Sequence, residues 1–562
     1  MMRTTLLAAT CGIFFLFGAD HASAEDPSSP LLKVCEADGN AAGPSTADAP
    51  IETDPGTQKA QEKPARYVED VALSERLQDL IANKLQQYVP RLQDRTAVEA
   101  FYQGRDFAPL WVNAGGPLPA TQKVIDFLHG VAADGLDPRD YPTPTFADRS
   151  PERLATDELA LTNSVVTFVR HASTGRVAFS RVSGSIYFDL KSPDLQQALE
   201  KIASSHDIAA TLDSFNPQQP QYKKLKAALA RAREKGDGVT PVTKTKIRRA
   251  HQNGRSQAKV PAARNDAILA NMERWRWLPR EVGTAYVMVN IPDYTLTVVN
   301  DGKPVWSTRI VVGQPGKHAT PLLAETMKYI TFNPTWNVPP SIIRNEYLPA
   351  LARDPTALAR IGLRIGRNGD GSIRIYQPPS DRNALGRVRF NFPNQFLVYQ
   401  HDTPDKYLFS KPVRAYSHGC MRVENPDKYA ETLLSISQPE ERYTVQRLHS
   451  LYGRGERNIN LKTPIPVYLT YQTAFIDNLG QMQTRPDIYG LDKTIVGLLN
   501  RDTPSVDIPI ARNHGGDSGP VMGHMPSRQI VEQPYSWDRS WDPYSAASGA
   551  SSYYRFDRRG SW

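Results

Sequence analysis

Cysteine is nearly absent from this chain, whose 562 residues contain only Cys11, Cys35 and Cys420. Exported proteins that rely on disulfides carry cysteines in generous, even numbers, so a disulfide-stapled fold is not indicated. Cys11 lies in the N-terminal apolar run and Cys35 in a polar, low-complexity stretch. A Cys35–Cys420 disulfide stays open, although a cysteine in a flexible linker is a poor structural partner. Cys420 is therefore kept for its reactivity, or it is a small buried side chain.

Long apolar runs are also missing, apart from one at the N-terminus. Arg3, the apolar residues 6–17 and Ala22-Ser23-Ala24 follow the plan of a secretory signal peptide, so we expect residues 1–24 to be removed. The run is too short for a stop-transfer helix, and no later stretch is long and uncharged enough to span a bilayer. An uncleaved anchor is the alternative; otherwise we expect no integral membrane span.

A long basic block is absent too, although the net charge is +8 and the pI about 9.1. Nucleic acid would be an unusual partner for an exported protein, and we expect none. The excess of Lys and Arg instead favours loose attachment to a polyanionic cell envelope.

Helical periodicity begins after a polar stretch. Residues 25–65, rich in Ala, Pro, Asp, Glu, Ser and Gly, are expected to be a disordered linker. Apolar residues then recur at helical spacing in the runs 73–85, 98–102, 124–131 and 159–169. These runs predict a helical domain over 66–235, with its third helix ended by Gly135. A polar, basic linker over 236–263 follows.

Beyond the linker the periodicity becomes that of β-strands. Strands are predicted over 286–291, 295–299, 305–312, 328–332, 372–376, 395–400 and 464–471. Asn300-Asp301-Gly302 predicts a hairpin, and two stretches, 341–360 and 425–436, are locally helical. We therefore expect a mostly β domain over 264–490 and a disordered tail over 491–562. The scattered aromatics of the tail are either inert or binding sites for sugars or proteins.

Cys420 stands in Ser417-His418-Gly419-Cys420-Met421-Arg422. A thiol attacks as thiolate, which needs a nearby imidazole or cation. In an extended segment residues two apart project from one face, so His418, Cys420 and Arg422 are expected to share a surface. Gly419 allows another backbone or a substrate to approach closely. The pattern predicts a cysteine nucleophile.

Simpler interpretations remain for these residues. Cys420 alone is compatible with core packing, and His401, His418 and Cys420 are a possible zinc set that lacks the spacing of structural sites. Arg422 is compatible with a local ion pair to Glu424.

Other residues attract no functional interpretation. Trp275 and Trp277 are expected in a core or interface, and His251 and His318 give no case for function.

The segment from His401 to Arg422 resembles the signature of the L,D-transpeptidases (YkuD-type catalytic domain), bacterial enzymes that cross-link peptidoglycan. Further resembling segments are 272–279, 290–292, 332–334, 336–340, 383–386 and 401–404. Residues 101–111 resemble the scaffold domain of the large periplasmic branch, so the resemblance covers roughly 66–490. The small peptidoglycan-binding domain usual in that branch has no counterpart, because 236–263 is too short and too polar.

The resemblance implies an α+β multidomain fold: a helical scaffold domain plus a mostly β catalytic domain with a lid insertion within 338–395. It also implies a reaction. Cys420 attacks the carbonyl between the L-centre of meso-diaminopimelate and the terminal D-alanine of a tetrapeptide stem. D-alanine leaves, and an amine of a second stem takes the acyl group to form a 3→3 cross-link.

The resemblance implies roles for the neighbours of the nucleophile. His401 is the general base, oriented by the carbonyl of Asp402. His418 supports the thiolate or positions substrate, Gly419 offers its N–H to the oxyanion, and Arg422 holds a substrate carboxylate or a loop. The residues expected to contact substrate are Ser417, Tyr416, Tyr376, Asn383, Gly386 and Phe392.

The implied partners are peptidoglycan stems and, in addition, other cell-wall enzymes; no cofactor or metal is implied. The implied location is the periplasm, in association with the cell wall. Three alternatives stay open: an L,D-carboxypeptidase that releases the acyl group to water, attachment of an envelope protein to peptidoglycan, and a noncatalytic wall scaffold.

Overall fold

The computed structural model describes residues 65–234, 260–369 and 371–500, all within one compact unit. The predicted signal peptide, almost all of the 25–65 linker, most of the 236–263 linker and the tail beyond 500 lie outside these residues, as do Cys11 and Cys35. Within the described ranges, none of the helices combines the length and the apolarity that crossing a membrane requires.

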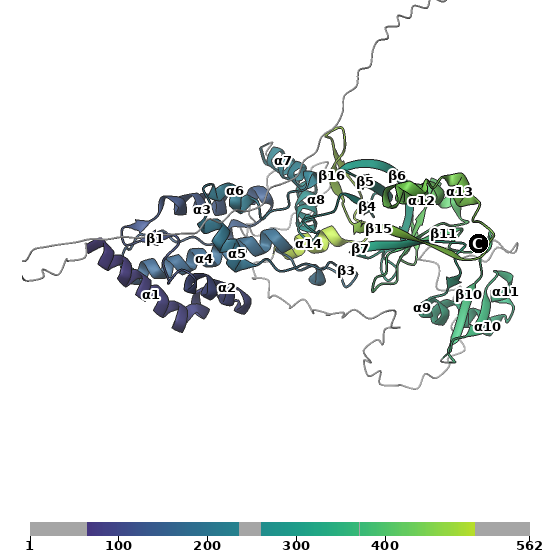
Figure 1. The fold of residues 1–562 in the computed structure, drawn as a ribbon, viewed down its shortest axis with the longest axis horizontal. Coiled ribbons are helices and arrows are strands. Elements are labelled where there is room, and N and C mark those ends of the chain that lie inside the picture. Colours follow the sequence, from purple (N-terminus) through teal and green to yellow (C-terminus); the bar gives the residue numbers. More distant parts are fainter. Residues whose placement is uncertain (1–64, 235–259, 370, 501–562) are drawn as a thin grey trace, which may run out of the picture. The chain divides into compact units, whose positions relative to one another are not determined.

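The first part of the described chain is helical, as predicted (Figure 1). Leu73, Leu77 and Leu80 are almost fully buried because a stripe at this spacing faces one side of a helix. The third helix and its 3₁₀ extension end at Gly135 in a left-handed conformation. The elements are α1 (Ala65–Tyr88), α2 (Leu92–Gln103), β1 (Val112–Asn113), β2 (Gly116–Pro117), α3 (Pro119–Gly130), η1 (Val131–Asp134), η2 (Pro138–Asp140), α4 (Pro151–Thr174), η3 (Phe179–Arg181), β3 (Ile186–Tyr187), α5 (Leu195–Ala203), α6 (Ile208–Asp213) and α7 (Pro220–Glu234).

The second part is mostly β, which confirms the predicted fold class. Its elements are α8 (Val260–Trp275), β4 (Ala285–Asn290), β5 (Thr295–Asn300), β6 (Lys303–Gly313), β7 (Leu322–Phe332), β8 (Trp336–Asn337), α9 (Pro340–Ile342), η4 (Ile343–Tyr347), α10 (Leu348–Arg353), α11 (Ala357–Arg360), β9 (Arg364–Arg367), β10 (Ile373–Gln377), β11 (Val388–Asn391), β12 (Gln400–His401), η5 (Lys406–Ser410), β13 (Ala415–Ser417), β14 (Met421–Val423), α12 (Pro426–Ser437), η6 (Pro439–Glu441), α13 (Val445–His449), β15 (Arg457–Thr470), β16 (Ala474–Ile476), β17 (Met482–Thr484) and α14 (Leu491–Leu499).

The main sheet closes on itself. Its strands pair in the order β11-β12-β14-β6-β5-β4-β15-β7, and β11 also pairs with β7. The predicted hairpin is present between β5 and β6, where Asp301 and Gly302 both have positive φ (51° and 69°), as a tight primed turn requires. Helix α12 supplies Tyr429, whose ring packs 4.3 Å from that of Phe390 on β11. Within this sheet β11, β12 and β14 are direct neighbours, which matters for the site.

An insertion between β7 and β11, residues 336–386, forms a small layer of its own. It holds the sheet β8-β10-β9 and a separate apolar core that includes Val338, Leu358 and Ile375. Its η4 segment is a turn of π-helix, a rare local structure that is frequent at functional sites. The insertion predicted within 338–395 is therefore a distinct structural piece.

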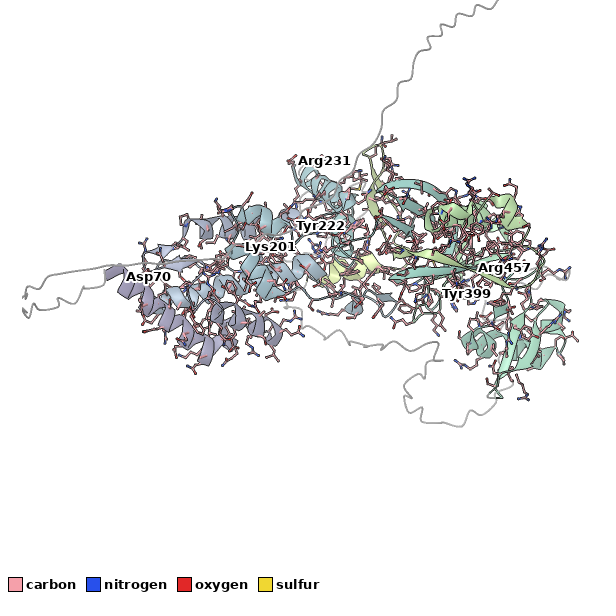
Figure 2. All side chains as sticks on the ribbon, viewed as in Figure 1. Asp70, Lys201, Tyr222, Arg231, Tyr399 and Arg457 are labelled. Carbon is pink, nitrogen blue, oxygen red and sulfur yellow. The ribbon has the colours of Figure 1, made fainter. Side chains whose placement is uncertain are left out.

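The predicted boundary at 235 does not separate the two cores. Strand β3 pairs in parallel with β7 of the main sheet (Figure 1), and Tyr222 of α7 (Figure 2) packs in the same core as that sheet. Buried Arg276 donates to the Asp134 carbonyl at 2.5 Å and to the Tyr222 hydroxyl at 2.8 Å. Trp277, fully buried, donates to the Val177 carbonyl at 3.1 Å. The tryptophans at the junction are interface residues, as predicted.

Two predictions of secondary structure are wrong. Of the strand predicted over 395–400, only Gln400 is in a strand, because Asn394 folds its side chain onto the backbone around it, accepting from the Val398 amide at 3.2 Å and donating to the Val398 carbonyl at 2.7 Å. The tail predicted to start at 491 begins instead with α14, whose Leu491, Ile495 and Leu499 pack into the main core.

Helix α14 should therefore contribute to stability. Ile495 is fully buried, so Ile495→Ala is expected to lower the free energy of unfolding by about 2–5 kcal/mol, measured by denaturant titration. Lys493→Ala, on the exposed face of the same helix, should change it by less than about 0.5 kcal/mol. Equal stability of the Ile495 variant and the unmodified protein would contradict this packing.

Candidate active site

His401 lies in the middle of a cross-strand row. In the registers of the sheet, Arg389 of β11 is opposite His401 of β12, which is opposite Arg422 of β14. The next row, Phe390, Gln400 and Met421, is fully buried in the core. Since successive residues of a strand point to opposite faces, the first row projects from the other face of the sheet.

The strand that carries the nucleophile is broken at Gly419. Strand β13 ends at Ser417, β14 begins at Met421, and Gly419 has φ +118°, a conformation that side chains strongly disfavour. The Thr320 hydroxyl donates to the Gly419 carbonyl at 2.8 Å. The expectation of one continuous extended segment is wrong: Cys420 and Arg422 follow the break, whereas His418 precedes it.

Ser417 holds this turn. Its hydroxyl donates to the Cys420 carbonyl at 2.5 Å and accepts the Gly419 N–H at 3.1 Å. In this structure the Gly419 N–H therefore already donates to the Ser417 hydroxyl oxygen. Its donation to the oxyanion of the reaction stays a prediction.

The imidazole of His401 is fixed by its neighbour. Its Nδ1 lies 2.5 Å from the Asp402 carbonyl oxygen, so Nδ1–H donates to that oxygen and Nε2 is left to accept a proton. The ring is buried, which lowers the pKa of His401 to about 3, with the charge of Arg422 acting in the same direction. The predicted contact between Asp402 and His401 is present, and its catalytic role stays a prediction.

Asp402 is itself held on several sides. Its Oδ2 accepts the Arg387 N–H at 2.8 Å, and its Oδ1 is paired with Lys406. A Cβ at Gly386 would overlap the Asp402 carboxyl group, so only glycine fits there. Gly386 thus acts on the site through Asp402.

The surroundings of Cys420, a half-buried residue, favour a neutral thiol at rest. Burial raises the pKa of the Cys420 thiol to about 11, against hydrogen bonds from the backbone and side chain of Tyr399 and the charges of Arg389 and Arg422. Tyr399 (Figure 2) has its ring 5.7 Å from that of His401. With the pKa of His401 lowered as well, a resting thiolate–imidazolium pair is not favoured.

His418 contacts the insertion. Its Nε2 is 2.9 Å from Oε1 of Glu346 on η4, and its ring packs edge-on against that of His318 at 4.4 Å. Burial and the neighbouring His418 lower the pKa of His318. His318, for which the sequence made no case, therefore lies beside the nucleophile's loop.

Arg422 does form an ion pair, but with Asp405 at 2.8 Å. Glu424, the predicted partner, is paired with Arg309 instead. Asp405 is brought into reach because it follows β12, the strand beside Arg422.

The predicted substrate-contact residues divide into two groups. Asn383 and Phe392 are buried, so their assignment to the wall of a cleft is wrong; the Asn383 amide donates to the carbonyls of Pro334, Gln377 and Pro378. Ser417 and Gly386 are buried too and have the structural contacts given above. Tyr376 and Tyr416 are half-buried, and their contact with substrate stays a prediction.

Sequence reasoning missed Tyr399, Arg389, Glu346 and His318. Tyr399 precedes His401 by two residues and so projects from the same face, a signal that was readable. The other three reach the site through pairings with distant parts of the chain.

The described residues hold no group of three or more His, Cys, Asp or Glu side chains arranged to bind a metal. The zinc alternative for His401, His418 and Cys420 therefore gains no support.

Comparison with known proteins agrees with this geometry. Residues 284–467 match the family model of the L,D-transpeptidase catalytic domain, and residues 96–229 match that of the scaffold domain. Residues 284–467, which include Cys420, are thus similar to the catalytic domain of the L,D-transpeptidase family. A Haemophilus influenzae protein named "Putative L,D-transpeptidase" is 32% identical over 226 residues, 37% of this chain and 45% of that protein. The chain thus matches less than half the length of this relative.

Solved structures of L,D-transpeptidases are similar at low identity. An L,D-transpeptidase from Mycobacterium smegmatis is 16% identical and covers 33% of this chain and 58% of its own, with a TM-score of 0.18. The E. faecium L,D-transpeptidase catalytic domain acylated by ertapenem is 14% identical and covers 34% of this chain and 99% of its own, with a TM-score of 0.14.

The raised thiol pKa predicts the pH dependence of alkylation. A thiol with a pKa of about 11 is mostly protonated at neutral pH, and its thiolate fraction rises about tenfold per pH unit up to that value. In a Cys35→Ser background, the rate of iodoacetamide labelling at Cys420 should therefore keep rising from pH 7 to pH 9. A rate that is flat over this range would indicate a preformed thiolate.

Proposed function

We propose that this protein is a peptidoglycan L,D-transpeptidase that forms 3→3 cross-links through an acyl-enzyme on Cys420. The observation that carries the proposal is His401, whose Nδ1–H is fixed by the Asp402 carbonyl at 2.5 Å on the same sheet face as the Cys420–Arg422 segment. A base whose tautomer is set, linked through Tyr399 to the one thiol of the described residues, is an arrangement suited to nucleophilic acyl transfer.

In the first half-reaction the thiol is activated as it attacks. Because the resting thiol is neutral, His401 Nε2 takes the Cys420 proton while the sulfur attacks the carbonyl of the diaminopimelate L-centre. The C–N bond to D-alanine then breaks, and the same proton passes from His401 to the leaving amine. A thioester on Cys420 and free D-alanine remain.

In the second half-reaction an amine of another stem attacks the thioester. The new C–N bond forms, the C–S bond breaks, and one amine proton returns through His401 to the Cys420 sulfur. The Tyr399 hydroxyl is hydrogen-bonded to the thiol at rest. We propose that it keeps a hydrogen bond to the sulfur in both half-reactions.

The insertion is proposed to act as the lid of this site. It contacts the site twice: Glu346 meets His418, and the Trp336 side chain is hydrogen-bonded to Tyr399. A lid in this place would exclude water from the thioester and favour an amine acceptor over hydrolysis.

Water or an envelope protein remains an alternative acceptor, which would make the protein an L,D-carboxypeptidase or a protein-attachment enzyme. The proposed location is the periplasm, and other cell-wall enzymes are the proposed partners of the helical domain.

The products of purified tetrapeptide muropeptides test this function. Incubation with the mature protein should yield 3→3 linked dimers and one D-alanine per cross-link, read by mass spectrometry. Cys420→Ala should form none, and Cys35→Ser should be nearly unchanged. Tripeptides alone, with acceptor stems present, would indicate a carboxypeptidase instead.

The two histidines should differ in their effects. His401→Ala should lower the rate of acyl-enzyme formation by at least ~10²-fold, since positioned proton transfer supplies this much. His418→Ala should have a smaller effect, because the Nε2 of His418 is already bound to Glu346. The opposite order, in single-turnover assays with the tetrapeptide, would exchange their roles.

A further inference from the structure

Two arginines flank His401 on the face of the sheet opposite the Phe390–Gln400–Met421 row. Arg389 and Arg422 are its direct cross-strand neighbours, and adjacent strands lie about 5 Å apart. Residues opposite each other on neighbouring strands project from the same face. The side chains of Arg389, His401 and Arg422 thus rise side by side.

Both arginines keep hydrogen-bond donors that no acceptor in the described residues satisfies. Within the described residues no carboxylate pairs with Arg389; its guanidinium packs over the Tyr399 ring, 5.4 Å from the centroid. Arg422 has one such partner, Asp405. The Nε atoms of both arginines are buried without a hydrogen-bond acceptor, which is costly for a charged group. Such donors point to an acceptor that arrives with a ligand.

Both charges also reach the reacting groups. Arg389 and Arg422 each act on the Cys420 thiol and on the His401 imidazole. A ligand group bound by these arginines would therefore lie in the neighbourhood of Cys420 and His401.

The proposed donor stem has an anion in this position. In the first half-reaction His401 gives its proton to the amine of the leaving D-alanine, and the α-carbon of that residue bears a free carboxylate. His401 must reach the amine nitrogen of D-alanine. The carboxylate is bonded to the α-carbon, which is the atom next to that nitrogen. A planar carboxylate also matches the fork of guanidinium donors.

We propose that Arg389, together with Arg422, binds the terminal carboxylate of the leaving D-amino acid and so selects stems with a single residue after the scissile bond. This inference rests on the proposed function, and it names the residues that would recognise the donor stem peptide. Arg389 would touch the substrate directly, from a strand that the cysteine motif does not include.

The experiment compares a carboxylate with its neutral analogue. Two tetrapeptide donors, one ending in D-alanine and one in D-alaninamide, are presented separately to the full mature protein, and acyl-enzyme formation is followed by intact mass. The unmodified protein should prefer the acid by at least about 10-fold in kcat/KM, as expected for a charge-assisted hydrogen bond. Arg389→Gln should bring this ratio close to one, and Arg389→Lys should restore part of it.

The ratio separates recognition from general damage. A change in thiol reactivity or in folding slows both donors alike and leaves the ratio unchanged. Arg309→Gln is the matched control, since it removes one positive charge from the same sheet at a residue paired with Glu424; it should keep the preference. An unchanged ratio in Arg389→Gln, or no preference in the unmodified protein, would overturn the inference, leaving Arg389 as a ring-stacking residue. Absence of any acyl-enzyme with either donor would instead count against the proposed function.

Discussion

The hydrogen bond from His401 to the Asp402 carbonyl is the contact on which the rest of the site depends. It sets which imidazole nitrogen carries the proton. Residues around Asp402 hold that residue in place and so maintain the hydrogen bond. Gly386 leaves room for the Asp402 carboxyl group, and Arg387 and Lys406 hold it. Strand pairing then places β11 and β14 on either side of β12, the strand that carries His401. Cross-strand register thus sets Arg389 and Arg422 beside the fixed histidine.

The protonation states impose a second constraint. With the pKa of the Cys420 thiol at about 11, forming the free thiolate at pH 7 costs roughly 5 kcal/mol. The low pKa of His401 makes a stable imidazolium equally unfavourable. Proton transfer and attack must therefore be coupled, and positive charge at Arg389 and Arg422 is available where negative charge develops. A neutral thiol also suits an oxidising compartment, because thiolates are the species that oxidise.

The sequence predicted the elements that depend on local patterns. The hairpin at Asp301-Gly302, the helices up to Gly135 and the paired strands β4 to β6 follow from periodicity and turn chemistry, and the cysteine motif pointed to Cys420 and His401. Helix α14 was readable as well, since Leu491, Ile495 and Leu499 recur at helical spacing, but it was assigned to the tail.

The rest depends on contacts between distant segments. The contact of His418 with Glu346 joins residues 72 positions apart, and Arg389 reaches His401 only through strand pairing. The family resemblance placed Asn383 and Phe392 in contact with substrate, whereas packing buries both. The partner of Arg422 was misjudged for the same reason: sequence proximity favoured Glu424, and the sheet supplied Asp405.

The central claim is that Cys420 becomes acylated by a stem peptide. Its most direct test is the intact mass of the mature protein, quenched within one turnover after mixing with a tetrapeptide donor and no acceptor, followed by peptide mapping. The account predicts an added mass equal to the stem without its D-alanine, located on the peptide that contains Cys420. Turnover with no covalent adduct, or an adduct on any other residue, would contradict it.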